Sequence, residues 1–228
     1  MKVACLFSGG KDSTFALYWA MLQGWDVKCI VSLIPKNKES YMFHVPNIGR
    51  TVYQAKAMNL PLITEKTSGE KEKELRDLKK ALKKTKTRYG ITGVVAGAIA
   101  SEYQRIRINL ICHELNLKVY APLWHKKPMN YLNELVEAGF KAKIISISAE
   151  GIPLSFLGKT INKPLLKKLA ELSRKHDFHP AFEGGEAETF VIDGPIFRKR
   201  IIIRKCRIIK ESENTAQLEI TELRLSEK

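Results

Sequence analysis

The sequence predicts an α/β protein in which a parallel, doubly wound sheet is followed by a smaller α+β C-terminal domain. Through the first half of the chain, apolar runs of strand length alternate with segments that have apolar residues at helical spacing. Such alternation is typical of a parallel sheet covered by helices on both faces. After Trp124 helices and strands follow in a mixed order. We therefore predict a first domain over residues 1–124 and a second over residues 125–228.

The first domain is expected to alternate strictly between strands and helices. The strands are predicted at 3–7, 26–34, 60–66, 91–99 and 117–124, and the helices at 14–23, 48–58, 71–88 and 102–115. A loop is expected over 35–47. Because parallel sheets bind ligands at the carboxyl ends of their strands, the glycine turn that follows the first strand is the predicted ligand site.

The second domain is expected to mix helices with an antiparallel sheet. Helices are predicted at 125–140 and 163–176, and strands at 142–150, 189–193, 197–210 and 216–225. The strand at 197–210 is basic and the one at 216–225 carries acids, so a hairpin with its turn at 211–215 would place opposite charges across from each other. This pairing gives the basic strand a structural explanation.

The amino-acid composition indicates what kind of protein this is and which kinds of partner it could attract. Hydrophobic residues make up 44% and charged residues 28% of the chain, as in an ordinary globular protein. Lysine and arginine total 39 against 24 acidic residues, a formal net charge of +15. Such a surplus attracts polyanions, including ATP, RNA and acidic protein surfaces, without choosing among them.

The cysteines and the start of the chain predict a soluble, cytoplasmic protein. The four cysteines form no CxxC pair, which argues against a zinc ribbon or a disulfide framework and for reduced thiols in a cytosol. The first strand begins at once, leaving no room for a cleavable signal, and no apolar stretch reaches membrane-spanning length. We expect no association with a membrane.

The glycine turn has the features of a phosphate-binding loop. It reads Ser8-Gly9-Gly10-Lys11-Asp12-Ser13. It is not a Walker loop, because Asp12 follows Lys11 and Cys5 stands where the first glycine would be. Backbone N–H groups at the glycines, the serine hydroxyls and Lys11 could bind an anion at the start of a helix. A carboxylate beside a phosphate suggests that Asp12 holds Mg²⁺ or places the helix; alternatively, Asp12 and Ser13 simply cap that helix.

This hexapeptide resembles the SGGxDS signature of the PP-loop, or N-type, ATP pyrophosphatases. The resemblance implies that ATP, with Mg²⁺, is cleaved between its α and β phosphates. It also implies an adenylated intermediate and a loop that holds the departing pyrophosphate.

Three further stretches resemble motifs of the diphthine–ammonia ligases, and the resemblance spans nearly the full chain. They are SYMFHVPN at 40–47, GAIASEYQRIR at 97–107 and EGGEAETFVIDGP at 183–195. The resemblance, to the short archaeal-type form, implies that the carboxylate of diphthine on translation elongation factor 2 is adenylated and then amidated. Because the chain has no N-terminal cysteine nucleophile and no space for a glutaminase domain, free ammonium is the expected nitrogen source.

The acidic motif is the predicted substrate site. Several carboxylates around a flexible glycine pair could converge on a metal, an ammonium ion or a proton that must be removed before ammonia attacks. Without the resemblance, a glycine turn with solvated acids would be the preferred interpretation. Glu183 and Glu186 are the expected catalytic residues, beside Lys11 and Asp12. The expected substrate-binding residues are Glu183, Gly184, Gly185, Glu186, Glu188 and Thr189.

Other residues are expected to bind the nucleotide. They are Met42, His44, Gly97, Tyr103, Gln104 and Arg105, besides the hexapeptide. His44 is expected to bind rather than catalyse. Arg105 could offset the charge of an adenylate or be an ordinary surface arginine. His176 and His179 have the spacing of a metal pair, but the sequence offers no suitable third ligand, so we reject a zinc site.

Two other functions are left open. A tRNA-modifying enzyme of the same superfamily would suit the basic charge, although the cysteines offer no pair for sulfur transfer. Binding of RNA would weaken steeply with salt. A second possibility is a nucleotide-binding module that does not catalyse a reaction. The sequence leaves the oligomeric state open, and a homo-oligomer is compatible with the predicted ligase.

Overall fold

The computed structural model describes residues 1–35, 46–68, 70 and 73–228. Its first half contains a parallel sheet in the order β3-β2-β1-β4-β5. The strands are β1 (Lys2–Leu6), β2 (Asp26–Pro35), β3 (Leu62–Thr67), β4 (Gly93–Val95) and β5 (Lys118–Tyr120). Since β1 lies in the middle and the order reverses there, the loop after β1 opens at the point where such sheets bind ligands.

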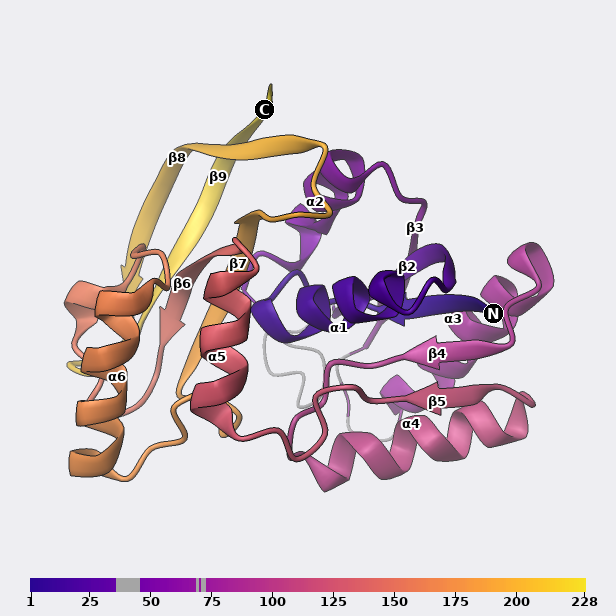
Figure 1. Cartoon of the computed structure of the whole chain (residues 1–228), viewed down its shortest axis with the longest axis horizontal. Helices are drawn as coiled ribbons and strands as arrows, with labels where there is room; N and C mark the ends of the chain where they lie inside the picture. Colours follow the sequence, from indigo (N-terminus) through magenta and orange to yellow (C-terminus); the bar gives the residue numbers. More distant parts are fainter. Residues whose placement is uncertain (36–45, 69, 71–72) are drawn as a thin grey trace.

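Helices cover both faces of this sheet, which confirms the predicted doubly wound fold (Figure 1). They are α1 (Lys11–Leu22), α2 (Thr51–Met58), α3 (Lys73–Tyr89) and α4 (Glu102–Glu114), with a short 3-10 helix, η1 (Ile48–Arg50), before α2. Alternate side chains of β1 point to opposite faces. Val3 and Cys5 join a core with α1 and α2, whereas Ala4 joins a second core with α3 and α4.

The second half forms a separate antiparallel sheet in the order β7-β6-β9-β8. Its elements are α5 (Pro128–Glu137), β6 (Lys141–Ile147), η2 (Leu154–Phe156), α6 (Lys163–His176), β7 (Ala187–Asp193), β8 (Lys199–Lys210) and β9 (Ala216–Glu227). α5 and α6 pack on one face of the sheet (Figure 1). This is the predicted α+β arrangement.

The hairpin of β8 and β9 pairs basic with acidic residues, as predicted. Lys199 lies 2.6 Å from Glu227, and Lys205 lies 3.1 Å from Glu222. The turn closes where the Glu211 N–H donates to the Thr215 carbonyl at 2.9 Å. Each exposed pair contributes only about 0–1 kcal/mol, so these ion pairs add little to the stability of the hairpin.

Two predicted strands are shorter in the structure than the sequence indicated. The apolar run 91–99 forms a strand only at 93–95, and the run 117–124 only at 118–120. Both runs leave the sheet after pairing with a neighbour, and residues 96–98 then line a cavity. Burial against the cavity accounts for the apolar character of residues 96–98, whereas Leu123, near the end of the second run, is buried in the hydrophobic core.

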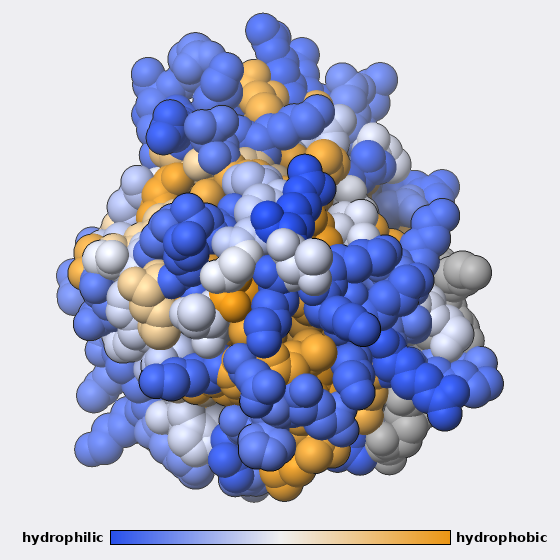
Figure 2. All heavy atoms as spheres, turned by 90° about the vertical axis from the view of Figure 1, so that its right-hand side faces the viewer, coloured by the Kyte–Doolittle hydropathy of each residue, from blue (hydrophilic) through white to orange (hydrophobic). Residues whose placement is uncertain are grey.

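Figure 2 shows the side of the molecule that lies at the right in Figure 1, where α3 and α4 end. This surface is largely hydrophilic, with smaller hydrophobic areas between the hydrophilic residues. α3 explains this pattern, because Leu78 and Leu82 are buried while its lysines face outward. Among the residues with described positions, no helix combines the length and the apolar character needed to cross a membrane.

Candidate functional site

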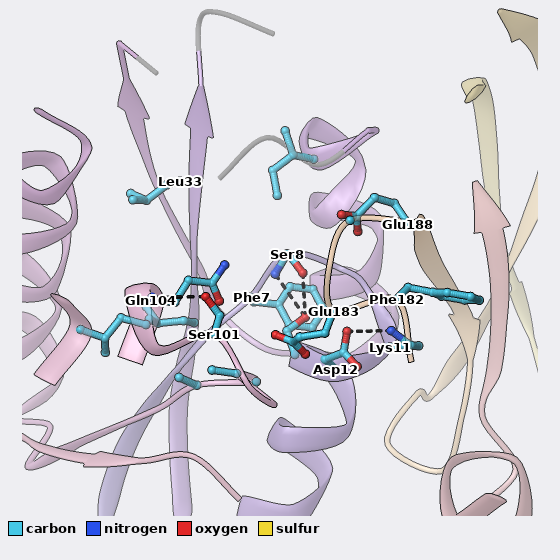
Figure 3. A pocket seen from close by; sticks show the side chains of 18 of the residues that line it. Phe7, Ser8, Lys11, Asp12, Leu33, Ser101, Gln104, Phe182, Glu183 and Glu188 are labelled. Carbon is cyan, nitrogen blue, oxygen red and sulfur yellow. Dashed lines mark hydrogen bonds and ion pairs between the residues drawn. The ribbon is translucent and has the colours of Figure 1, made fainter. Parts of the chain in front are cut away.

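A cavity of about 500 Å³ opens at the carboxyl ends of the parallel strands (Figure 3). Its walls come from the loop after β1, the loop after β4, the start of α4 and the segment that leads into β7. Eleven of the predicted site residues line it: Ser8, Lys11, Asp12, Ser13, Gly97, Tyr103, Gln104, Glu183, Gly184, Gly185 and Glu188. Motifs far apart in the sequence thus surround one space.

The glycine turn adopts a conformation suited to an anion. Gly9 has φ of 84°, a left-handed conformation that favours glycine. Ser13 Oγ accepts the Ser8 N–H at 3.2 Å, which curls the loop over the start of α1. Gly10 is the N-cap of α1 and makes no side-chain cap. Neither Asp12 nor Ser13 is therefore the N-cap residue, and because Gly10 has no side chain to cap the helix, an anion such as phosphate could bind at its start.

The loop is bound directly to β7 of the other sheet. The Val191 N–H donates to the Gly9 carbonyl at 3.0 Å, and the Lys11 N–H donates to Thr189 Oγ1 at 3.0 Å. Gln54, from α2, is completely buried and donates through Nε2 to the carbonyls of Gly9 and Val191, both at 2.8 Å. Thr189, predicted to bind substrate, thus supports the loop. The acidic motif is anchored to the phosphate loop through the backbone.

Lys11 and Asp12 form an ion pair inside the cavity. Lys11 Nζ lies 2.9 Å from Asp12 Oδ2 and 5.3 Å from the centre of the Phe182 ring. The other oxygen, Asp12 Oδ1, accepts a hydrogen bond from Tyr131 Oη at 2.8 Å. Burial, and then the charge of Asp12, raise the pKa of Tyr131 well above its usual value, so the phenol remains protonated and donates.

Two glutamates of the acidic motif face this ion pair. Burial, and then the negative charge of Asp12, raise the pKa of Glu183 above its usual range. Burial also raises the pKa of Glu188 to about 7; Lys11 opposes the rise, while Asp12, Glu183 and Glu186 add to it. A carboxyl with a pKa near neutrality can both accept and release a proton at physiological pH.

Glu186 does not line the cavity. Its carboxylate accepts hydrogen bonds from the N–H groups of His179 and Gly184, at 2.8 and 2.9 Å, and so fixes the turn before β7. Burial lowers the pKa of His179, whose Nδ1 accepts the Glu183 N–H at 3.4 Å. Both residues thus shape the acidic segment.

The remaining predicted residues lie elsewhere. Gly9 and Gly10 form the turn behind the cavity wall. Arg105 pairs with Glu102 at 2.7 Å and stacks 5.0 Å from the Trp124 ring, outside the lining of the cavity. Met42 and His44 lie outside the described residues. The roles of all these residues stay predictions.

The side chains that line the cavity are compatible with a magnesium ion bound together with a nucleotide. Within residues 1–35, 46–68, 70 and 73–228, no group of three or more His, Cys, Asp or Glu side chains could hold a metal. Mg²⁺ bound with a nucleotide needs no such group, because it takes one or two carboxylates together with phosphate oxygens and water. Asp12 could supply such an oxygen, because each carboxylate oxygen has two lone pairs and the hydrogen bond from the neutral Tyr131 hydroxyl uses one lone pair of Oδ1.

Sequence reasoning missed Tyr131, Gln54 and Phe182. Each lies in an ordinary helical or loop segment, and none carries a motif. Tyr131 had one indirect signal, because it shares the apolar face of α5 with Leu132 and Leu135, and a buried tyrosine hydroxyl needs a partner. That partner could not be named from the sequence.

The elevated pKa of Glu188 predicts that Glu188→Gln changes stability in a pH-dependent way. Because its pKa in the folded protein, about 7, lies above the ordinary value of 4.5, folding favours the protonated form. The stability that this preference contributes is complete below pH 4.5 and is lost as pH rises through about 7. The variant should therefore match the wild type in Tm at pH 4.5 and exceed it at pH 8. An equal difference in Tm at both values would contradict the assigned titration.

Both halves of the chain match models of one protein family. Residues 1–119 match the family model described as the diphthamide synthase N-terminal domain, and residues 127–222 match its C-terminal domain. The human protein named diphthine–ammonia ligase is 34% identical over 100% of this chain and 94% of its own length. A protein of that name from Schizosaccharomyces pombe is 34% identical over 93% of this chain and 38% of its own length. The Danio rerio protein is 34% identical, covering 94% and 91%.

Proposed function

Because this chain belongs to the diphthamide synthase family, we propose that it is an ATP-dependent diphthine–ammonia ligase acting on translation elongation factor 2. The diphthine carboxylate attacks the α-phosphorus of ATP, forming an acyl-adenylate and releasing pyrophosphate. Ammonia then attacks the acyl carbon, and AMP leaves as the amide forms. Ammonium loses one proton to become the attacking ammonia, and the nitrogen loses a second proton as the tetrahedral intermediate collapses to the amide and AMP.

The features of the phosphate loop support its role with the nucleotide. The start of α1, where the N-cap Gly10 has no side chain, suits the β- and γ-phosphates, which leave as pyrophosphate. The serine hydroxyls and the Lys11 ammonium in the same cavity suit them as well. Mg²⁺, when bound through Asp12, would neutralise part of the phosphate charge. Gly97, Tyr103 and Gln104 line the same cavity and are proposed to contact the rest of the nucleotide.

The acidic segment is proposed to receive the diphthine and the ammonium ion. Glu183 and Glu188 face the cavity, and either carboxylate could accept the proton that ammonium loses. Glu188 suits this task best, since its pKa of about 7 permits both protonation states at neutral pH. Glu186 would act indirectly, by holding the turn in place.

One observation favours this proposal over the alternatives. The phosphate loop and the acidic segment line a single cavity. A module that only binds ATP would have no need for partly buried carboxyls next to the phosphates, because they repel the ligand. An adenylating ligase needs both features at one place.

The proposal is tested by incubating the protein with diphthine-bearing elongation factor 2, Mg-ATP and ammonium. Mass spectrometry of the modified peptide should show conversion of the carboxyl to the amide, with AMP and pyrophosphate formed in step. AMP without peptide conversion would point to another acceptor, such as tRNA. Binding of ATP without cleavage would favour the non-catalytic module.

A further inference from the structure

Tyr131 connects the two halves of the chain at the ion pair of the cavity. It lies on α5, is completely buried, and donates a hydrogen bond to Asp12 Oδ1 at 2.8 Å. The other oxygen of Asp12 lies 2.9 Å from Lys11 Nζ. The carboxylate is therefore held at both oxygens, once by a neutral donor from the second half and once by the cation next to it in the loop.

We propose that Tyr131 is a positioning residue that fixes the orientation of Asp12, and through it that of Lys11, for binding and cleavage of the nucleotide. The role rests on the proposed function, since it concerns the same cavity. Tyr131 does not line that cavity, so it would act on the nucleotide only through Asp12.

The need for such a residue follows from the mobility of the aspartate side chain. The last torsion of aspartate is broad, so its carboxylate turns easily when nothing holds it. The Asp12 side chain keeps 32% of its surface exposed, whereas that of Lys11 keeps only 3%. Lys11 alone holds one oxygen, and the hydroxyl of Tyr131 fixes the plane of the carboxylate by holding the second.

The tyrosine ring is itself fixed by α1. Phe15, on the same helix as Lys11, packs edge-on against the Tyr131 ring with centroids 5.4 Å apart. The ring and the hydroxyl therefore contact the same helix at two points. A positioning residue needs this rigidity, because a mobile donor would follow the carboxylate instead of orienting it.

The decisive variant is Tyr131→Phe, which removes the hydroxyl and keeps the ring. Loss of a hydrogen bond to a charged group typically changes an equilibrium or rate constant by roughly tenfold or more. We expect kcat for AMP formation to fall about tenfold or more and the Kd for Mg-ATP to rise, with Tm close to that of the wild type.

Tyr18→Phe is the matched control. Tyr18 lies on α1 in the same aromatic cluster, with its ring 5.3 Å from that of Phe140, and it does not line the cavity. It should behave as the wild type.

A double-mutant cycle separates positioning from a general structural role. If Tyr131 acts through Asp12, Tyr131→Phe should not weaken Mg-ATP binding further in an Asp12→Ala background. A second loss of affinity in the double variant would overturn the inference. So would wild-type kinetics of Tyr131→Phe, or an equal loss in Tyr18→Phe.

Thermal unfolding provides a readout that does not depend on the nucleotide. Asp12→Ala leaves the buried Tyr131 hydroxyl without its acceptor and should lower Tm, and adding Tyr131→Phe should restore part of the loss. No restoration would overturn the contact itself, even if the single Tyr131→Phe variant proves unstable. A wild-type protein that neither binds nor cleaves ATP would overturn the proposed function instead, and this cycle would still test the contact.

Discussion

Asp12→Ala is expected to reduce ATP cleavage at least about hundredfold while the protein remains folded. Removing one group that organises charge at a reaction centre typically costs about 10²–10³ in rate. Asp12 orients Lys11 and is the proposed source of an oxygen for Mg²⁺, so its loss affects both positive charges near the phosphates. The measurement is AMP formation at saturating ATP, with circular dichroism to confirm the fold.

The cost to stability should be modest compared with the cost to activity. The Asp12 side chain is partly exposed, and the orphaned Tyr131 hydroxyl accounts for a loss of roughly 1–3 kcal/mol. Asp12→Asn refines the result, because it keeps an oxygen for Tyr131 and removes the charge. Turnover at the wild-type rate in Asp12→Ala would exclude Asp12 from the mechanism.

Gly97→Ala is expected to weaken nucleotide binding strongly, because the added methyl group would displace the backbone of the phosphate loop. A Cβ at this position would lie 2.7 Å from the carbonyl carbon of Asp12 and from the amide nitrogen of Ser13. Both contacts are with backbone, so either the phosphate loop or the loop after β4 must shift. Overpacking of this kind costs typically about 1–3 kcal/mol. Titration with Mg-ATP and thermal unfolding measure the two effects.

Gly49→Ala is the matched control for this substitution. A Cβ at Gly49 meets no atom within 4 Å, and the residue lies outside the cavity lining. It should change stability by less than about 1 kcal/mol and leave nucleotide binding unchanged. If Gly97→Ala bound ATP as well as Gly49→Ala, close packing at Gly97 would have no role in shaping the loop.

The sequence predicted features that depend on local pattern. The parallel sheet follows from alternating apolar runs and amphipathic helices, and the pairing of β8 with β9 follows from opposite charges on two strands joined by a short turn. The phosphate loop was recognisable because its residues are contiguous. Each of these signals lies within a few residues, or within one hairpin.

The features that escaped prediction depend on contacts between distant segments. Tyr131 and Asp12 are separated by 119 positions, and Gln54 meets Val191 across 137. No local pattern indicates which buried tyrosine meets which aspartate. The three glutamates of the acidic motif also could not be told apart from the sequence. Glu186 accepts hydrogen bonds from backbone N–H groups, whereas Glu183 and Glu188 face the cavity.

The backbone joint between the phosphate loop and β7 restricts how the protein can move. Gly9 and Val191 are connected directly and also through Gln54. Phe15 packs against the rings of both Tyr131 and Phe140. Rotation of one sheet about a hinge would break these hydrogen bonds and expose that aromatic cluster to water. These contacts oppose a hinge motion between the two sheets. The phosphate loop and β7 should therefore move as one unit, and a substrate of the proposed reaction would meet them in a fixed relation to each other.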